Sequence, residues 1–296
     1  MGETKIDRLI AGMPWLDRAA GVLKTVGEPI AGESAPRALR DALVGTWFGH
    51  PLHPAVVIAP IGFWTSSVAL DLAGEERAAD LTLALGLASA GGAVVTGIAQ
   101  WQDAAKNLKP RRLGALHATL NTVSTGIFVG SLVARRSGAR TEGRALSLLG
   151  YAVSGAAAHL GGALSYDLGL GVDHAAFEKP PTDWTDVVRF ADLPEGEPVK
   201  VDADGVAVLL FRRGERITAI GNTCPHLGGP LNEGTIDGDC VRCPWHDSVF
   251  RLADGGLVHG PATTPVDAYQ VRVVNGQVSI RVDDAAAQKD AALQSA

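Results

Sequence analysis

The sequence of 296 residues is poor in aromatic side chains, which make up 5% of it, and rich in glycine, with 36 residues. This combination is unusual for a soluble enzyme. The sequence also lacks a basic stripe and a basic face studded with aromatic rings, which argues against nucleic acid as a partner. Residues 1–40 lack both a long apolar core and a twin arginine, so we expect no secretory signal there.

Charged side chains are missing from four long stretches, at residues 42–70, 81–102, 113–134 and 145–166. The first stretch is 29 residues long and each of the others is 22. About 20 predominantly apolar residues cross the hydrocarbon layer of a bilayer as a helix. Because charged residues close each stretch, the sequence predicts four transmembrane helices.

The N-terminal segment, residues 1–44, has apolar residues near helical spacing. These are Ile6, Leu9, Ile10, Met13, Leu16, Leu23 and Val26, and Arg8, Arg18 and Lys24 lie among them. The pattern fits a helix that lies in the membrane interface. It fits equally well a soluble helix that packs on the rest of the chain, and the sequence leaves both alternatives open.

Loop charges give a weak preference for one orientation in the membrane. The face that receives both termini has six basic residues near the bilayer, and the opposite face has five. The two sets are Arg37, Arg40, Lys106, Lys109, Arg111 and Arg112 against Arg77, Arg135, Arg136, Arg140 and Arg144. Because cytoplasmic loops carry the excess of Lys and Arg, we expect both termini in the cytoplasm.

Beyond the fourth stretch the charge and the pattern of the chain change. Residues 1–182 have 16 basic and 15 acidic residues, a net +1, whereas residues 183–296 have 10 and 17, a net −7. Short β-rich runs separated by turn signals such as Asn275-Gly276 predict a small β-sandwich. We therefore expect a membrane helical bundle (45–170), a linker (171–183), an all-β domain (184–283) and a mobile tail (284–296).

Two short segments of the β region each offer one thiol and one imidazole. They read Cys224-Pro225-His226 and Cys243-Pro244-Trp245-His246, with sixteen residues between them. Sets of two cysteines and two histidines usually bind zinc tetrahedrally, and Cys240 is close enough in sequence to join such a site. The first pair is too tightly spaced for the usual zinc finger, so zinc is the weaker interpretation.

The pattern resembles the Rieske iron–sulfur family, whose motif is C-x-H, about sixteen residues, then C-x-x-H. The resemblance covers residues 184–283. Further matching positions are Gly228-Gly229, Pro230-Leu231, Phe250 and the proline-bearing loop Gly260-Pro261-Ala262. The resemblance implies a [2Fe–2S] cluster in which Cys224 and Cys243 hold one iron as thiolates, while His226 and His246 hold the other. It also places the hydroxyl of Ser248 where it can donate to a cluster sulfur.

The third cysteine, Cys240, then has no partner for an internal disulfide. Some members of the family that face oxidising compartments carry an extra cysteine pair that clamps the two cluster loops, and this chain lacks that pair. The absence favours a reducing, cytoplasmic setting for the C-terminal domain.

Residues 45–170 resemble an uncharacterised family of predicted membrane domains with four helices. The resemblance rests on His50-Pro51-Leu52-His53-Pro54, Pro60-Ile61-Gly62, His117 and His159, and it brings no activity with it. We expect His53, His117 and His159 in the same half of the bilayer, where ionisable residues usually mark a function. Three interpretations are open: a b-type haem bound by two of them, a quinone pocket, or a structural hydrogen-bond network with Asn121 and Thr125.

These features predict a membrane-anchored Rieske protein that carries single electrons between a membrane redox partner, a quinone or a haem, and a cytoplasmic partner. We expect an electron-transfer component of the oxidoreductase type with no catalytic residue of its own. A ring oxygenase needs a second iron site after the cluster, built on two histidines and a carboxylate. The 50 residues that follow His246 contain only one histidine, His259, which argues against an oxygenase. The alternative is a non-redox membrane scaffold or sensor whose C-terminal domain a metal or cluster stabilises.

Overall fold

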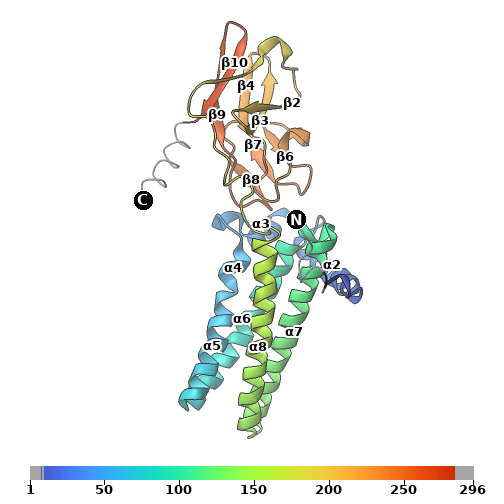
Figure 1. The fold of residues 1–296 in the computed structure, drawn as a ribbon, viewed down its shortest axis with the longest axis vertical. Helices are drawn as coiled ribbons and strands as arrows, with labels where there is room; N and C mark the ends of the chain where they lie inside the picture. Colours follow the sequence, from blue (N-terminus) through green and yellow to red (C-terminus); the bar gives the residue numbers. More distant parts are fainter. Residues whose placement is uncertain (1–7, 9, 284–296) are drawn as a thin grey trace. The chain divides into compact units, whose positions relative to one another are not determined.

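The computed structural model describes residues 8 and 10–283, which form two compact units (Figure 1). Unit 1 comprises the chain up to Gly45 together with Pro51–Leu170, and it is helical. Unit 2 comprises Thr46–His50 and the chain from Gly171 onward, and most of its regular structure is β-sheet. The predictions for Ile6, Leu9 and the tail at 284–296 lie outside the described residues.

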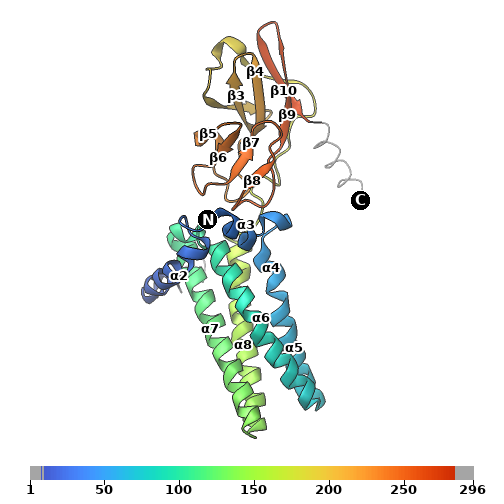
Figure 2. The ribbon, with the colours of Figure 1, turned by 180° about the vertical axis from the view of Figure 1, so that it is seen from behind.

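Long helices that run side by side make up most of unit 1 (Figures 1 and 2). They are α4 (Leu52–Val56), α5 (Ile58–Ala73), α6 (Glu76–Trp101), α7 (Leu108–Arg136) and α8 (Arg140–Tyr166). Gly74 ends α5 with a φ of 84°, and Gly138 turns the chain between α7 and α8 with a φ of 88°. Such left-handed backbone favours glycine, and these short turns make α5/α6 and α7/α8 antiparallel neighbours.

Three helical segments of the described chain are long and apolar enough to cross a membrane, judged by length and composition. They are Leu52–Ala73, Glu76–Trp101 and Leu108–Arg136, with mean hydropathies of 1.6, 1.8 and 1.2. The fourth predicted span forms the 27-residue helix α8 but is not among them. Its uncharged stretch contains several glycine and serine residues, two tyrosines and His159, which lower its hydropathy. The predicted class, a membrane helical bundle followed by an all-β domain, is confirmed.

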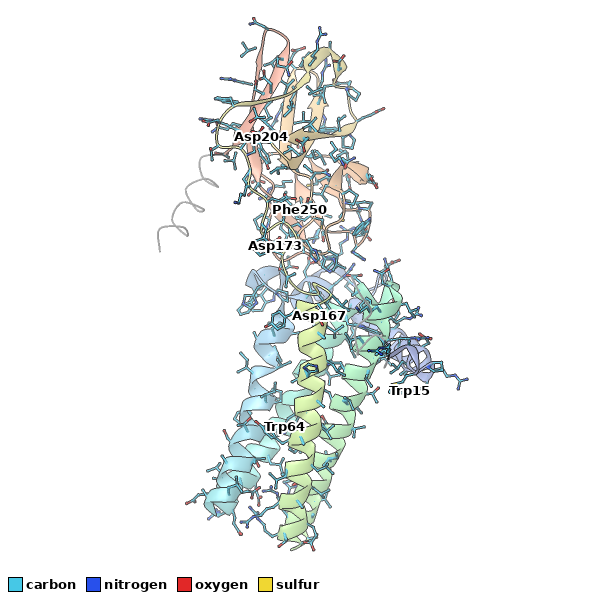
Figure 3. All side chains as sticks on the ribbon, viewed as in Figure 1. Trp15, Trp64, Asp167, Asp173, Asp204 and Phe250 are labelled. Atoms are coloured by element: carbon cyan, nitrogen blue, oxygen red, sulfur yellow. The ribbon has the colours of Figure 1, made fainter. Side chains whose placement is uncertain are left out.

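Small residues let the helices of unit 1 approach closely. A side chain at Gly86 would collide with the ring of Trp64, and a side chain at Gly114 would collide with the ring of Trp101. Trp64, near the middle of the bundle in Figure 3, stacks on Phe128 with ring centroids 4.4 Å apart. Close packing of this kind drives helix association in lipid, where no hydrophobic force acts between helices.

An ionic network joins the four long helices where α5 ends and α6 begins. Arg135 on α7, whose side chain is 0% exposed, donates to Asp71 and to Asp80. Arg140 at the start of α8 donates to the same two carboxylates. Ser131 and Ser147 complete the hydrogen bonds of Arg135, at 3.1 and 2.8 Å. The network therefore neutralises the charges that the sequence places beside the uncharged stretches.

The N-terminal segment forms α2 (Trp15–Ala31) and α3 (Arg37–Val44). Helix α2 lies at one end of α7 (Figures 1 and 2), and it buries Leu16 and Ala20 completely. Asp17 accepts hydrogen bonds from Arg111 and Arg112, which tie α2 to α7. Another face of α2 is apolar and exposed, with Trp15, Val22 and Val26 at 45%, 63% and 57%. The helix therefore packs on the bundle and also presents an apolar face suited to a membrane interface.

Unit 2 contains two antiparallel sheets. The larger has the order β1-β10-β9-β4-β3-β2, with β1 (Thr185–Arg189), β2 (Pro198–Ala203), β3 (Val206–Arg213), β4 (Arg216–Gly221), β9 (Ala268–Val274) and β10 (Gln277–Val282). The smaller has the order β5-β6-β7-β8, with β5 (Thr235–Asp237), β6 (Cys240–Arg242), β7 (Val249–Arg251) and β8 (Leu257–His259). The predicted hairpin is confirmed, since Asn275 and Gly276 join β9 to β10 with φ values of 53° and 78°.

A separate apolar core lies beside the smaller sheet. Phe250 and Leu231 are fully buried there, and Cys224 and Cys243 pack in the same core at 1% and 2% exposure. This core therefore holds both cysteines, which begin the two turns described next.

Candidate metal centre

Two turns of unit 2 hold the four residues of the Cys/His motif. The first follows β4, and it is closed by hydrogen bonds from Cys224 N to Gly229 O and from Gly228 N to Cys224 O, both 2.9 Å. The second follows β6, and it is closed by Cys243 N to Ser248 O at 2.8 Å and Asp247 N to Cys243 O at 3.2 Å. Each turn therefore begins at a cysteine and folds its histidine back toward the other turn.

The four side chains form a pair of sulfurs and a pair of imidazoles. The rings of His226 and His246 lie edge to face with centroids 5.0 Å apart. The thiol of Cys224 donates to the sulfur of Cys243, and this hydrogen bond, with those from the backbone N–H groups of Trp245 and His246, lowers the pKa of Cys243 to about 7. The hydrogen bond with Cys243 and burial raise the pKa of Cys224, whereas the backbone N–H of His226, which points at its sulfur, acts in the opposite direction. Such N–H donors stabilise thiolates, the form that binds iron.

The arrangement fits a cluster better than a single ion. No group of three or more His, Cys, Asp or Glu residues in the described part of the chain could hold one metal ion. A [2Fe–2S] cluster needs only two ligands at each iron, which matches the separate sulfur and imidazole pairs. Gly229 leaves room beside them, since a Cβ there would come 2.9 Å from the sulfur of Cys243. The donor set therefore fits the group that the motif implies.

Asp247 and Ser248 form the end of the second turn. Ser248 is fully buried, donates its hydroxyl to the sulfur of Cys224, and accepts a hydrogen bond of 3.0 Å from the N–H of Ala262. Ser248 thus joins the sulfur pair to the proline-bearing loop. Asp247 is exposed and has a φ of 64°, a left-handed conformation that glycine and aspartate tolerate best.

One side of the centre is open to solvent. His226 and His246 are half-buried, whereas Pro244 and Trp245 are exposed, the latter by 48%. A partner can therefore reach the imidazole pair without unfolding either turn. The remaining thiol, Cys240, lies on β6 and belongs to no three-ligand group among the described residues.

Sequence reasoning missed a third segment at the centre, within the stretch expected to be a linker. Residues 173–178 hydrogen-bond to both the first turn and the proline-bearing loop through Asp173, His174 and Glu178. No short motif signals these contacts, because their partners are 45 to 91 residues away in the sequence.

Two of the three membrane histidines, His53 and His117, are half-buried among the helices of unit 1. His53 Nδ1 is 3.3 Å from Thr96 Oγ1, and His117 Nδ1 is 2.8 Å from the carbonyl oxygen of Ala157. The other ring nitrogen of His117, Nε2, is 3.2 Å from Asn121 Nδ2. Both ring nitrogens of His117 are thus in hydrogen bonds, which leaves neither available to an iron without rearrangement.

His159 takes a different position from the other two histidines. It is exposed on α8, whereas its neighbours Ala157 and Leu160 are buried. Gly97 and Gly161 make room for the rings of His53 and His117, since a Cβ at either glycine would lie within about 3 Å of a ring carbon. Among the three interpretations, this geometry favours the hydrogen-bond network, which extends through Thr125 Oγ1 to the carbonyl oxygen of Asn121 at 2.8 Å.

Comparison with known proteins gives two family matches. Residues 183–270 match the Rieske [2Fe-2S] domain, and residues 49–174 match a family described as predicted membrane protein (DUF2231). Over 98 residues the chain is 34% identical to ferredoxin CarAc of Metapseudomonas resinovorans, which is 33% of this chain and 92% of the ferredoxin.

Two further relatives match the same region. The chain is 36% identical over 96 residues to the 3-phenylpropionate/cinnamic acid dioxygenase ferredoxin subunit of Escherichia coli (strain K12), covering 32% of this chain and 90% of that protein. The solved ferredoxin of carbazole 1,9a-dioxygenase from Nocardioides aromaticivorans IC177 is 28% identical, covers 34% of this chain and 98% of that chain, and has a TM-score of 0.32.

Proposed function

The chain belongs to the Rieske [2Fe–2S] family through its C-terminal domain, and we propose that it carries single electrons between a membrane redox partner, a quinone or a haem, and a cytoplasmic partner protein. The observation that carries this proposal is the sulfur pair beside the imidazole pair, buried on one side and open on the other. A [2Fe–2S] cluster bound there supplies a centre for one-electron transfer.

The residues of unit 2 have separate tasks in this proposal. The thiolates of Cys224 and Cys243 bind from the buried side, where the apolar core excludes water from the sulfurs. His226 and His246 bind from the open side, so the path for an electron to a docked partner runs through an imidazole edge. Trp245 is exposed next to His246 and offers an aromatic surface for that partner.

The partner on the cytoplasmic side is proposed to be a protein. The relatives named above are ferredoxins or ferredoxin subunits of dioxygenases, which supports electron delivery to another protein rather than catalysis in this chain. The apolar helices of unit 1 and the match to a predicted membrane protein family support a position in the cell membrane. There, a quinone or a membrane haem is the nearest source of electrons.

The metal content of the chain tests this proposal directly. The full chain purified in detergent is expected to contain two irons and two acid-labile sulfides and to take up one electron on redox titration. One zinc and no sulfide would instead support the scaffold or sensor alternative.

The same preparation tests the bundle, since a reducible b-type haem spectrum that disappears in His117→Ala would place a haem among the membrane histidines.

The orientation of the domain is a second prediction. A reporter enzyme fused after Ala296 is expected to be active only if it folds in the cytoplasm, because the basic residues favour the side of both termini and Cys240 has no disulfide partner. A matched fusion between α7 and α8, after Gly138, is expected to give the opposite result. Activity of a periplasm-dependent reporter after Ala296 would reverse the proposed orientation.

Ser248 and Asp247 are predicted to tune the reduction potential of the bound cluster in opposite directions. Ser248→Ala is expected to lower the midpoint potential, because hydrogen bonds to the sulfurs stabilise the added electron. Asp247→Gly is expected to raise it, because an exposed carboxylate beside His246 is removed and glycine accepts the left-handed backbone. For the wild type we expect a potential in the lower half of a range from about −150 to +300 mV. Asp247 adds a negative charge near the cluster, and Phe250 has no hydroxyl that could donate a second side-chain hydrogen bond to it.

A matched control separates charge from backbone effects in that redox titration. Asp204 is exposed, has a φ of 55°, and lies in the turn between β2 and β3, outside both turns of the metal centre. Asp204→Gly removes the same charge from the same kind of turn and is expected to leave the potential unchanged. An unchanged potential in Ser248→Ala, or a wild-type value near the top of the range, would contradict this account of the tuning.

A further inference from the structure

Residues 173–178, here called the strap, lie across two loops of the metal centre. The strap ends before the Rieske match begins at residue 183. Its first two residues lie at the end of the match to the predicted membrane protein family, which runs to residue 174. The strap residues and the partners described below belong to unit 2.

The strap binds the first turn on both sides of its ligands. The N–H of His174 donates to the carbonyl oxygen of Pro225 at 3.0 Å, and Pro225 lies between Cys224 and His226. The hydroxyl of Thr223 donates to Glu178 Oε1 at 2.5 Å. The side chain of His174 also lies over Gly228, where an added Cβ would come 3.8 Å from its Nδ1. The strap therefore contacts the first turn at Thr223, Pro225 and Gly228.

The other end of the strap binds the proline-bearing loop. The hydroxyl of Thr264 donates to Asp173 Oδ2 at 3.1 Å. The second oxygen of Asp173 accepts a hydrogen bond of 2.8 Å from the N–H of Ala175, which fixes the direction of the carboxylate. Thr264 is two residues beyond Ala262, whose N–H donates to Ser248. One continuous chain of contacts thus joins the first turn, the strap, the proline-bearing loop and the second turn.

The strap contacts involve carboxylates that are partly buried or hydrogen-bonded, which is unusual for a flexible linker. Glu178 is partly buried, and this burial raises the pKa of its carboxyl although the hydroxyl of Thr223 stabilises the charged form. Asp173 and Asp267 lie close enough to raise it further. Asp173 and Glu178 of the strap and the nearby Asp267 are carboxylates that repel one another, and the hydrogen bonds from Thr223 and Thr264 offset this repulsion.

We propose that the strap is a positioning element of the cluster site, which holds the first turn against the proline-bearing loop. It does so in a chain whose only spare cysteine, Cys240, is unpaired, so no disulfide joins the two turns. The proposal rests on the function proposed above, because the groups that the strap positions are Cys224 and His226. Loss of the strap lets water reach these ligands and speeds the release of iron.

The test uses the full chain in detergent and two threonine replacements that preserve shape. Thr223→Val combined with Thr264→Val removes both hydroxyl donors to the strap. We expect this double variant to lose its cluster to an iron chelator on the order of tenfold faster than the wild type, because two hydrogen bonds to carboxylates are lost. We also expect faster hydrogen exchange at the amides of residues 224–229, and a higher midpoint potential because solvent exposure of the cluster increases.

A matched control removes a similar hydrogen bond elsewhere in unit 2. Thr185 Oγ1 donates to Asp204 Oδ2 at 2.8 Å, so Thr185→Val deletes a hydroxyl–carboxylate pair away from the centre. It is expected to release iron at the wild-type rate. Asp173 provides a rescue pair, since Asp173→Ala removes both of its hydrogen bonds whereas Asp173→Asn retains an oxygen for Ala175 and an amide for Thr264. We expect fast release in the first variant and slow release in the second.

The outcomes separate the strap from the function of the domain. The strap proposal is overturned, and the proposed function stays intact, if the wild-type chain holds two irons and two sulfides while the strap variants behave like Thr185→Val. The comparison covers iron release, hydrogen exchange and midpoint potential. A wild-type chain without iron or sulfide overturns both. Equal release from Asp173→Ala and Asp173→Asn also overturns the strap proposal, because the conservative variant would then rescue nothing.

Discussion

Replacing either Cys224 or Cys243 with serine is expected to remove essentially all iron and sulfide from the purified chain. Both sulfurs are almost completely buried in one apolar core, and each is approached by backbone N–H donors that stabilise a thiolate. A serine hydroxyl does not ionise in this pH range and is a poor ligand for iron in such a centre. With only two ligands expected at each iron, the loss of one leaves that iron without a stable site.

Cys240→Ser is the matched control for this result. Cys240 has the same chemistry and lies three residues before Cys243, but it is on β6 and outside the sulfur pair. It is expected to keep full iron and sulfide content, measured by colorimetric assays on the same preparation. Loss of metal in Cys240→Ser as well as in Cys243→Ser would contradict the assigned ligands and revive a zinc site that contains both residues.

Arg135→Met is expected to destabilise the helical bundle by about 3–5 kcal/mol, the usual cost of leaving a buried charge without its partner. The guanidinium of Arg135 is 0% exposed and donates to Asp71, which is 6% exposed. After the replacement, Asp71 keeps only the hydrogen bonds and ion pairs from Arg140 and Arg144. The measurement is the free energy of unfolding of the full chain in detergent, followed by the helical circular dichroism signal.

The neighbouring Arg136 provides the control for Arg135. It is exposed at the end of α7, so Arg136→Met removes the same charge and is expected to change stability by less than about 1 kcal/mol. Equal stability of Arg135→Met and the wild type would show that the network contributes nothing to the bundle.

The cluster ligands and the membrane class could be predicted because their signals are local. Cys224 to His246 is one short stretch of chain, and each turn is closed by hydrogen bonds between residues five or fewer positions apart. The helices of unit 1 are marked by the absence of charge over a length set by the bilayer. In both cases the physical requirement acts on neighbouring residues, so the order of the amino acids is enough to reveal it.

The contacts of the membrane histidines and of the strap depend on residues far apart in the chain. His117 and His159 have similar sequence signals, yet only the rotation of α7 and α8 turns His117 toward Ala157 and leaves His159 exposed. Helix α8 also forms as predicted, although it is not among the helical segments apolar enough to cross a membrane. A pattern of uncharged residues predicts a helix but does not decide which side of it faces its neighbours.

By itself the sequence determined the two-part organisation and placed the four proposed cluster ligands and Ser248 in two short segments, because these features depend on spacing between nearby residues. Only the tertiary structure decided that Arg135 is neutralised by carboxylates 55 and 64 residues away, and that Asp173 and Thr264, 91 residues apart, meet at the centre. Polar groups at such positions look like ordinary linker or loop residues in the sequence. Their roles arise when folding removes them from water, so that their hydrogen-bond partners have to come from the protein itself.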